Sequence, residues 1–361
     1  MNHSEIFYKV DIVVIGAGQA GLSAAYHLKK RGINPGKGFV ILDDEPHAGG
    51  AWQHRWDSLT LSIVNGINDL PGLTFSEAVH IQDKELQANK AVPAYYEKYE
   101  KEYDFPIIRP LRVDKVEENN GRFLIRTNGV QFSARGIVNA TGTWKTPNIP
   151  HYPGIEKFEG RQLHTNQYKN AEEFIGQHVI IVGGGISAVQ LLGEISKVTE
   201  TTWVTRRPPD FRDNKFTEEL RREAVAMVDK RVREGLPTQS VVSVTGLPIT
   251  PAIESLLHTD VLDRKPMFDE ITEKGVKWND GTVLNADVIF WNIGFRHSLD
   301  HLAPLHLQNE KGGIEMSGKL ATQVAKDPRI HLTGYGPSAS TIGANRAGSA
   351  VAREIIAYLG L

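Results

Sequence analysis

Two segments of this chain have the same order of elements, and this duplication limits the folds that it can adopt. The sequence "VDIVVIGAGQAGLSAAYHLKKRG" begins at Val10, and "HVIIVGGGISAVQLLGEIS" begins at His178. Each contains an apolar run, a glycine-rich turn and a run with helical spacing, and a second apolar run follows each. Alternation of strands and helices predicts parallel sheets. We therefore expect an α/β fold with two Rossmann-like dinucleotide-binding domains.

The first turn has the pattern G-x-G-x-x-G between a strand and a helix. Its first glycine makes a tight turn, its second lets the backbone approach a pyrophosphate, and its third lets the helix pack on the strand. The N-terminus of the helix attracts the phosphates. The residues expected at the cofactor are Gly16, Gly18, Gln19, Ala20 and Gly21. Asp43 follows the next strand at the distance where a carboxylate binds the adenosine ribose. Asp44 or Glu45 could share that role, and Asp43 could also be a simple turn residue.

The second turn carries Gly183 and Gly185, with Ala188 at the third position, a permitted variant of the pattern. Ser187 begins the following helix, where its hydroxyl is expected to cap the turn or meet a phosphate. The next strand ends at Arg206 and Arg207 instead of an acid. Two cations at this point suit the 2′-phosphate of NADP, although they could also be solvated arginines before the Pro-Pro turn.

The two turns together predict FAD and NADPH in one chain, and hence hydride transfer to a flavin. The second unit interrupts the first, so we expect the NADP domain to be inserted into the FAD domain. The predicted segments are 1–165 and 287–361 for the FAD domain and 166–286 for the NADP domain.

Composition removes several classes of function. The 41 Lys and Arg residues nearly balance the 43 Asp and Glu residues, so no global charge favours nucleic acid or an anionic membrane. The basic stretch 206–233 is interleaved with acids and indicates a solvated helix more than an RNA-binding face. The chain has no Cys, which excludes a redox disulfide, an iron–sulfur cluster and a Cys-ligated metal. We expect no membrane span, no metal site and a cytoplasmic location.

A further motif lies between the two turns, in "FEGRQLHTNQY". Its fixed positions are Phe158, Gly160, His164 and Tyr168. Other shared features are "GGAW" from Gly49 to Trp52 and "NATG" ending at Gly142. On these residues the sequence resembles the class B flavin-dependent monooxygenases, of the compact bacterial flavin-containing monooxygenase type, over nearly the whole chain. Three positions depart from the family pattern: Tyr168-Lys169 where Baeyer–Villiger enzymes have Trp-Pro, Asn292-Ile293-Gly294 at a second ATG-like site, and Gly336-Pro337 where a Gly-Asp is common.

The resemblance implies an activity and further site residues. NADPH would reduce FAD, dioxygen would form a peroxyflavin, and a soft nucleophile such as a sulfide or amine would take the oxygen. Asn65 is the candidate catalytic hydrogen-bond donor, with Asn68 second; an Asn-Gly turn is the structural alternative. Trp52 and Trp56 would wall the flavin or belong to the core. Further flavin contacts are expected at Gly50, Thr141, Gly142, Gly336 and Ile342.

The functional alternatives are a Baeyer–Villiger monooxygenase acting on a ketone, and a flavin reductase or NADPH oxidase without oxygenation. The expected partner is a small molecule, not a nucleic acid or a membrane, and a homodimer is possible. His164 is expected to be a structural hydrogen-bonding residue that braces two domains and not a general base, because this chemistry asks little of protein bases.

Overall fold

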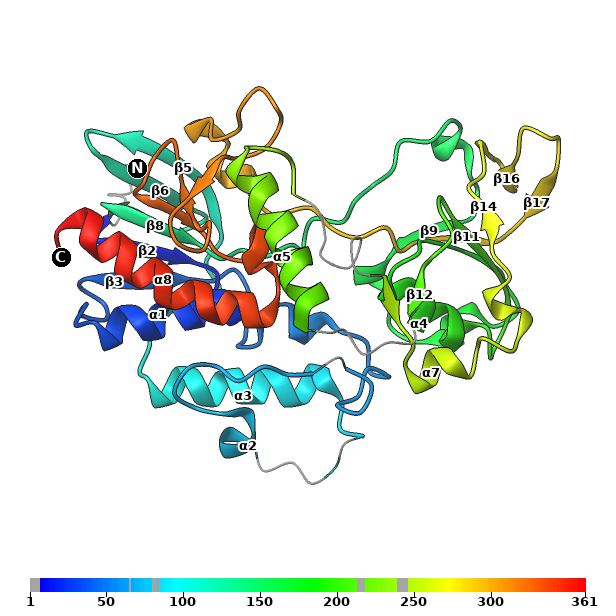
Figure 1. Cartoon of the computed structure of the whole chain (residues 1–361), viewed down its shortest axis with the longest axis horizontal. Coiled ribbons are helices and arrows are strands. Elements are labelled where there is room, and N and C mark those ends of the chain that lie inside the picture. Colours follow the sequence, from blue (N-terminus) through cyan, green and yellow to red (C-terminus); the bar gives the residue numbers. More distant parts are fainter. Residues whose placement is uncertain (1–6, 65, 80–82, 84, 213–217, 239–245) are drawn as a thin grey trace, which may run out of the picture. The chain divides into compact units, whose positions relative to one another are not determined.

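The computed structural model describes residues 7–64, 66–79, 83, 85–212, 218–238 and 246–361. The chain forms two compact units. The first unit contains residues 1–142, 225–240 and 297–361, and the second contains residues 143–224 and 241–296. Each unit holds one of the two glycine-rich turns, at the start of helices α1 and α4 (Figure 1). The mixed α/β architecture with parallel sheets and two dinucleotide-binding folds is the one predicted.

The main sheet of the first unit has seven strands in the order β19-β20-β21-β8-β2-β3-β4. From β21 to β4 neighbouring strands are parallel, and β19 and β20 extend the sheet antiparallel. The bounds are β2 Ile12–Ile15, β3 Phe39–Leu42, β4 Ile107–Ile108, β8 Gly136–Asn139, β19 Met316–Ser317, β20 Gln323–Val324 and β21 Ile330–Leu332. Strands β2, β3 and β8 are buried along their whole length, as expected of parallel strands covered on both faces.

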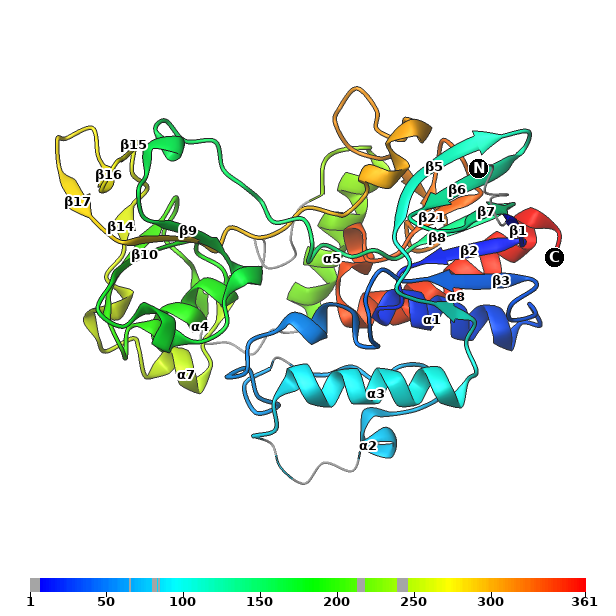
Figure 2. The same ribbon diagram turned by 180° about the vertical axis from the view of Figure 1, so that it is seen from behind.

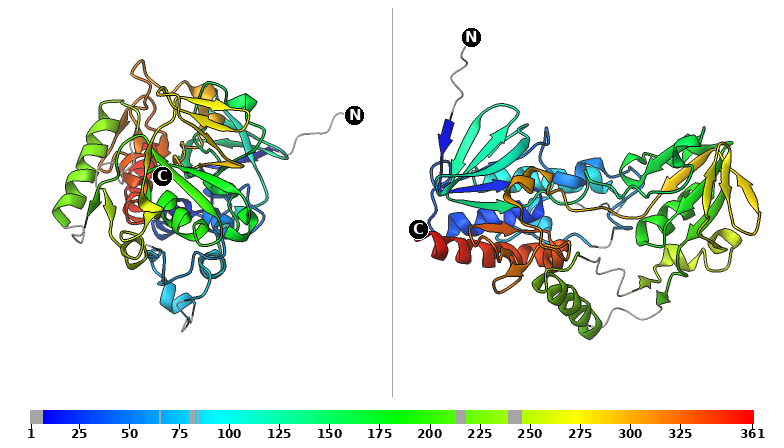
Figure 3. Two further views of the ribbon diagram at one scale, coloured as in Figure 1. Left: turned by 90° about the vertical axis from the view of Figure 1, so that its right-hand side faces the viewer. Right: turned by 90° about the horizontal axis from the view of Figure 1, so that it is seen from above.

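Side chains that alternate along these strands enter two different cores. Ile12, Val14 and Ile41 pack with the helices on one face. These helices are α1 Gln19–Lys30, α3 Ala88–Glu102 and α8 Thr341–Leu359. Helices α1 and α8 lie side by side in Figure 2 and Figure 3. Their close crossing requires Gly348, because a Cβ there would lie 2.3 Å from the Ser23 hydroxyl.

The opposite face of the sheet packs on a four-stranded sheet of order β1-β7-β6-β5. Val13 and Val40 share this core with Phe123 and Phe132. The strands are β1 Phe7–Lys9, β5 Val113–Asn119, β6 Arg122–Thr127 and β7 Gln131–Ala134. The unit also contains α2 Phe75–Ala78, most of α5 Glu218–Arg233, and the 3-10 turns η1 Gly50–His54, η6 Asp300–Leu305 and η7 Gly336–Ala339.

The second unit is built on a parallel five-stranded sheet of order β14-β11-β10-β18-β9. Its strands are β9 Arg161–His164, β10 His178–Val182, β11 Glu200–Thr205, β14 Lys265–Pro266 and β18 Val288–Trp291. Helix α4 Ile186–Ile195 connects β10 to β11. Smaller elements are β12 Phe211–Arg212, β13 Leu247–Pro248, β15 Glu270–Thr272, β16 Gly275–Lys277, β17 Val283–Asn285, α7 Pro251–Glu254, η2 Ile155–Lys157, η3 Thr165–Gln167, η4 Ala171–Phe174 and η5 Asp260–Leu262.

The unit boundaries differ from those predicted at 165/166 and 286/287. Strand β9 precedes the first predicted boundary but pairs with β18 in the sheet of the second unit. Strand β18 follows the second predicted boundary, yet it also pairs with β10. Strand pairing therefore moves both segments into the second unit. Residues 225–240 return to the first unit, where Val232 joins the core below Gly336.

Within the described ranges, no helix is long and apolar enough to cross a membrane.

Candidate dinucleotide-binding sites

The first glycine turn leaves room for a ligand at one position only. Gly16 has φ 100°, and a Cβ there would lie 2.6 Å from the Ala140 carbonyl oxygen. A Cβ at Gly21 would lie 1.9 Å from the Gly16 carbonyl oxygen, so these two glycines are required by backbone packing. Gly18 is the N-cap of α1, no side chain caps the helix, and a Cβ at Gly18 would meet nothing within 4 Å. The first-turn amides, including those of Gln19 and Ala20, thus form a cradle that fits a pyrophosphate.

Asp43 lies at the C-terminal end of β3, beside this cradle, and is only 4% exposed. Its Oδ1 lies 3.5 Å from the Ala17 amide, and its Oδ2 accepts two hydrogen bonds from Arg109, at 3.0 Å from Nε and 2.8 Å from Nη2. Burial raises the pKa of Asp43, and the charge of Arg109 opposes this rise. Asp44, the alternative, is exposed, and Glu45 is buried against the His54 ring.

A polar cluster surrounds the start of α1. The side-chain amide of Gln19 donates to Asn345 Oδ1 at 3.1 Å and to the Asn68 carbonyl at 3.2 Å. Its oxygen accepts from the Tyr96 hydroxyl at 2.8 Å. The Gln19 side chain is thus fully engaged by the protein, which leaves its backbone amide as the group available to a phosphate. Tyr96 and Asn345 were not predicted, because neither lies in a recognisable motif.

The "GGAW" segment packs directly on the turn. A Cβ at Gly50 would lie 3.1 Å from the Gly18 Cα, so the segment closes one side of the cradle. Trp52 is half-buried against the core below α1, with the Arg55 guanidinium 5.8 Å from its ring centroid. Trp56 is buried, with 5% of its surface exposed. Trp56 is therefore a core residue. The partly exposed ring of Trp52 is the one of the two that is accessible to a flavin.

The other predicted contacts lie at the ends of β8 and β21. The Thr141 hydroxyl donates to the Ser298 carbonyl at 2.6 Å and accepts from Asn139, whose oxygen is 2.7 Å from His301 Nε2. Gly142 has φ 64° with open space around it. Gly336 has φ 55°, and a Cβ there would lie 2.9 Å from Val232, so backbone conformation and packing both favour glycine. Ile342 is 49% exposed. Asn65 lies outside the described residues, and Asn68 uses its carbonyl for Gln19.

The second turn repeats the geometry of the first. Gly183 has φ 140°, and a Cβ there would lie 2.2 Å from the Asn292 carbonyl oxygen. Gly185 is the N-cap of α4, and a Cβ at this position would meet nothing within 4 Å. Ala188 is fully buried, and Ser187 is half-buried in the first turn. The departure from an ATG-like sequence at Asn292 leaves this packing intact, because its backbone carbonyl closes on Gly183 and its side chain accepts from the Thr165 hydroxyl.

The end of β11 is basic. Arg206 and Arg207 are exposed, and within the described residues neither forms an ion pair. Arg264 adds a third cation that was not predicted: its Nη1 donates to the Thr205 carbonyl at 3.1 Å and lies 3.3 Å from the Thr205 hydroxyl. That hydroxyl donates to the Arg207 carbonyl at 2.8 Å. In the sequence Arg264 stands only in the basic pair Arg264-Lys265, and such pairs are too common on protein surfaces to indicate a site.

The stretch Phe158–Tyr168 lies wholly within the second unit. Phe158 enters its core, and a Cβ at Gly160 would lie 2.3 Å from the Asp287 carbonyl oxygen. The Tyr168 hydroxyl donates to Glu194 of α4 at 2.5 Å, and its ring stacks on Phe290. The stretch therefore fixes β9 and α4 around the second turn.

His164 lies in a buried, aromatic part of the second unit. The ring is 5% exposed and packs edge-on to Phe295, with ring centroids 4.9 Å apart. Within the described residues neither ring nitrogen forms a well-shaped hydrogen bond. Burial lowers the pKa of His164 to about 4, which the Gly294 backbone partly offsets, so the ring is neutral at physiological pH. The ring also packs against a buried aromatic pair, Phe295 and Trp144, so its surroundings in the second unit are largely apolar.

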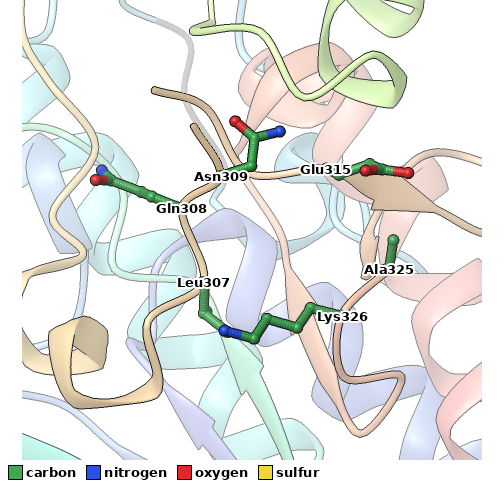
Figure 4. Close-up of a pocket in the computed structure, with 6 residues that line it drawn as sticks. All are labelled: Leu307, Gln308, Asn309, Glu315, Ala325 and Lys326. Atoms are coloured by element: carbon green, nitrogen blue, oxygen red, sulfur yellow. The ribbon is translucent and has the colours of Figure 1, made fainter. Parts of the chain in front are cut away.

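The first unit also has a pocket of about 430 Å³, lined by Leu307, Gln308, Asn309, Glu315, Ala325 and Lys326 (Figure 4). None of the predicted site residues lines it. The Lys326 ammonium donates to the His306 carbonyl at 2.6 Å. The pocket therefore gives no support to a cofactor or substrate site of its own.

The chain belongs to the pyridine nucleotide-disulphide oxidoreductase family, which matches residues 13–334. An uncharacterized oxidoreductase named CzcO from Bacillus subtilis is 36% identical over 341 residues, covering 91% of this chain and 89% of that protein. A CzcO from Bacillus velezensis is also 36% identical, over 56% of each chain. A flavin-containing monooxygenase from Stenotrophomonas maltophilia has 34% identity and a TM-score of 0.81, covering 97% of this chain and 99% of that one.

A plant relative is more distant: the flavin-containing monooxygenase FMO GS-OX1 of Arabidopsis thaliana is 27% identical over 229 residues, and the match spans only 49% of its length. Together these likenesses place the chain among the class B flavin-dependent monooxygenases within its family. The chain is therefore an oxidoreductase of the type that depends on FAD, NADPH and dioxygen. It has no cysteine, so the disulphide in the family's name has no counterpart in this protein.

Proposed function

We propose that this protein is an NADPH-dependent monooxygenase that transfers one oxygen atom of dioxygen to a sulfide or an amine. The observation that carries the proposal is the pairing of two unlike nucleotide cradles in a chain without cysteine. An acid at the end of β3 suits a free ribose, and arginines at the end of β11 suit a 2′-phosphate. Because the chain has no cysteine, a reduced flavin cannot pass its electrons to a disulfide of this chain.

The assignment of cofactors to units follows from the same residues. The amides after Gly18 and the carboxylate of Asp43 would hold FAD in the first unit. The amides after Gly185 and the guanidinium groups of Arg206 and Arg207 would hold NADPH in the second. When bound, FAD would accept a hydride from NADPH, and the reduced flavin is the group that reacts with dioxygen.

Few side chains of this chain are suited to acid or base work in such a reaction. His164, His297 and His301 all have their pKa lowered to about 4, in each case by burial. Such rings remain neutral and fixed, so they can orient neighbours but do not exchange protons near neutral pH. This agrees with a reaction that depends on cofactor positions and on the exclusion of water. Asn65 stays the proposed hydrogen-bond donor to the reacting oxygen.

The overall reaction is NADPH, a proton, dioxygen and a sulfide giving NADP⁺, water and a sulfoxide. The name of one relative, a senecionine N-oxygenase of Tyria jacobaeae, supports oxygenation at a heteroatom. The test supplies the FAD-loaded protein with NADPH and methyl p-tolyl sulfide, and in parallel with N,N-dimethylaniline or cyclohexanone. NADPH oxidation, hydrogen peroxide and products are measured together.

We expect close to one oxygenated sulfide or amine for each NADPH, with little peroxide. Peroxide equal to NADPH, without product, would identify an oxidase. Formation of a lactone from cyclohexanone with no sulfoxide would identify a Baeyer–Villiger enzyme. Either result would contradict the proposal.

A further inference from the structure

Three charged side chains meet at the C-terminal end of β3. Arg109 donates from Nε and Nη2 to Asp43 Oδ2, and from Nη1 and Nη2 to the two carboxylate oxygens of Glu100, at 2.6 and 3.0 Å. The three side chains are 15%, 5% and 11% exposed for Arg109, Asp43 and Glu100. Two largely buried ion pairs that share one guanidinium are costly to desolvate, so this arrangement calls for a role beyond stability.

The sheet register explains how Arg109 reaches Asp43. Leu42 at the end of β3 is paired with Ile108 at the end of β4, so the next residue of each strand lies at the same edge. Two backbone hydrogen bonds also join Asp43 to this segment: its amide donates to the Ile108 carbonyl at 3.1 Å, and its carbonyl accepts from the Leu111 amide at 2.7 Å. Glu100 comes from the last turns of α3. Asp43 is thus fixed by the end of β4 and the residues after it, and α3 anchors Arg109 in turn.

The two carboxylate oxygens of Asp43 have different hydrogen-bond partners. Oδ2 receives both Arg109 bonds, whereas Oδ1 has only the long contact of 3.5 Å with the Ala17 amide in the glycine turn. A carboxylate oxygen has room for about two hydrogen bonds. Oδ1 is therefore the acceptor that remains for a ribose hydroxyl, and it lies on the side of the cradle.

Four of the five N–H groups of Arg109 are already used within this cluster, so little of its donor capacity remains for a phosphate. Nε and Nη2 point to Asp43, and Nη1 and Nη2 point to Glu100. The cluster carries one net negative charge, from two carboxylates and one guanidinium. It would repel a 2′-phosphate and accept a free ribose, which is the opposite of the strand end at Arg206 and Arg207.

We propose that Arg109, anchored by Glu100, is a positioning residue that holds the carboxylate of Asp43 aimed at the adenosine ribose of FAD. This inference rests on the proposed function, because it takes the first unit as the FAD site. It adds two residues that lie outside every glycine-turn motif. It also explains why the first cradle selects a nucleotide without a 2′-phosphate although an arginine stands at its acidic strand end.

The charges around Asp43 determine what the loss of Arg109 would do. Burial raises the pKa of both Asp43 and Glu100, and the charge of Asp43 raises the pKa of Glu100 further. Asp44 adds a further negative charge nearby, and Arg109 is the cation that opposes all three effects. Without Arg109 the pKa of Asp43 rises further. The carboxylate then takes up a proton as pH falls, and ribose binding weakens with it.

The experiment measures the dissociation constant of FAD between pH 6 and 8.5 for apoprotein prepared from the holoenzyme, using the change in flavin fluorescence. Wild type is expected to bind with an affinity that is flat over this range. Arg109→Met should bind more weakly, with a dissociation constant that rises about tenfold for each pH unit below the pKa of Asp43. Adding Glu100→Gln to that variant removes the like charge and should shift the rise to lower pH.

Two further variants separate positioning from folding. Arg109→Lys keeps the charge and should show a flat profile with an intermediate affinity; it also serves where Arg109→Met does not yield folded protein. Arg329→Met breaks a comparable half-buried pair with Asp327, 2.7 Å apart, elsewhere in the same unit. It should lower thermal stability and leave the affinity for FAD unchanged.

An unchanged affinity in Arg109→Met, or a loss that is equal at every pH and untouched by Glu100→Gln, would overturn the inference. A wild-type chain that binds no FAD would contradict the proposed function itself, and the inference with it. The two failures are distinguished by the wild-type titration.

Discussion

The ends of β3 and β11 occupy equivalent places in two similar folds, but their electrostatics are opposite. At the end of β3 a buried carboxylate is held by Arg109, which a second acid neutralises. At the end of β11 two arginines are exposed, and Arg264 holds the strand end instead of an acid. The glycine turns beside them are nearly the same. This difference shows that the two parts of each site have separate roles. The glycine turn provides the site for a pyrophosphate, whereas the charges at the strand end determine whether the nucleotide has a free ribose or a 2′-phosphate.

The largest expected effect comes from a side chain that blocks one of the two pyrophosphate sites. Gly18→Val should yield colourless protein, because the branched side chain enters the open space where a pyrophosphate would lie. The matched change Gly185→Val should keep the yellow flavin and abolish reduction by NADPH. Both residues have φ within the range of ordinary residues, so folding should survive. Flavin content is measured by absorbance; a normal content in Gly18→Val would show that the FAD site is misplaced.

The next effect concerns the basic strand end. Changing Arg206 and Arg207 together to Ala should raise the KM for NADPH about 10- to 100-fold and leave that for NADH almost unchanged, because only NADPH has the 2′-phosphate. Steady-state kinetics with both cofactors check this. Arg212→Ala is the control, since Arg212 is already paired with Asp210 at 2.7 Å. Equal losses with NADPH and NADH would disprove the assignment of the phosphate site.

A smaller effect is expected at Arg264. Replacement by Met removes the bonds to the carbonyl and hydroxyl of Thr205, and so loosens the backbone that carries both exposed arginines. The KM for NADPH should rise about three- to tenfold, again with little change for NADH. If both cofactors lose affinity equally, Arg264 supports the fold of the strand end and not its selectivity.

The smallest effect is expected at His164. His164→Ala removes the ring that packs on Phe295, and we expect slower reduction by NADPH or more peroxide release, by about two- to fourfold, with FAD retained. His164→Phe keeps an aromatic ring and should behave like wild type. Rapid-mixing measurements of flavin reduction and a peroxide assay check this. A His164→Phe variant as impaired as His164→Ala would show that a ring nitrogen is needed after all.

The sequence predicted the parts of this comparison that depend on local order. Both strand–turn–helix units, Asp43 and the Arg206–Arg207 pair follow from spacing along one segment, because a parallel strand is short, apolar and followed by its turn.

What the sequence did not predict depends on pairing between distant segments. Arg109 reaches Asp43 only because β3 and β4 are neighbours, and Arg264 reaches Thr205 only because β14 pairs with β11. Strands β9 and β18 were assigned to the wrong side of the predicted boundaries for the same reason. The aromatic packing of His164 depends on Phe295, which is remote in sequence.

The central claim is that the two strand ends select two different nucleotides, and a fragment of NADP tests it most directly. The FAD-loaded protein is titrated calorimetrically with 2′,5′-ADP and, separately, with 5′-ADP. We expect one site per chain, with 2′,5′-ADP bound about tenfold or more tightly than 5′-ADP, and no displacement of FAD. Equal affinity for the two fragments, or release of flavin by either, would contradict the account.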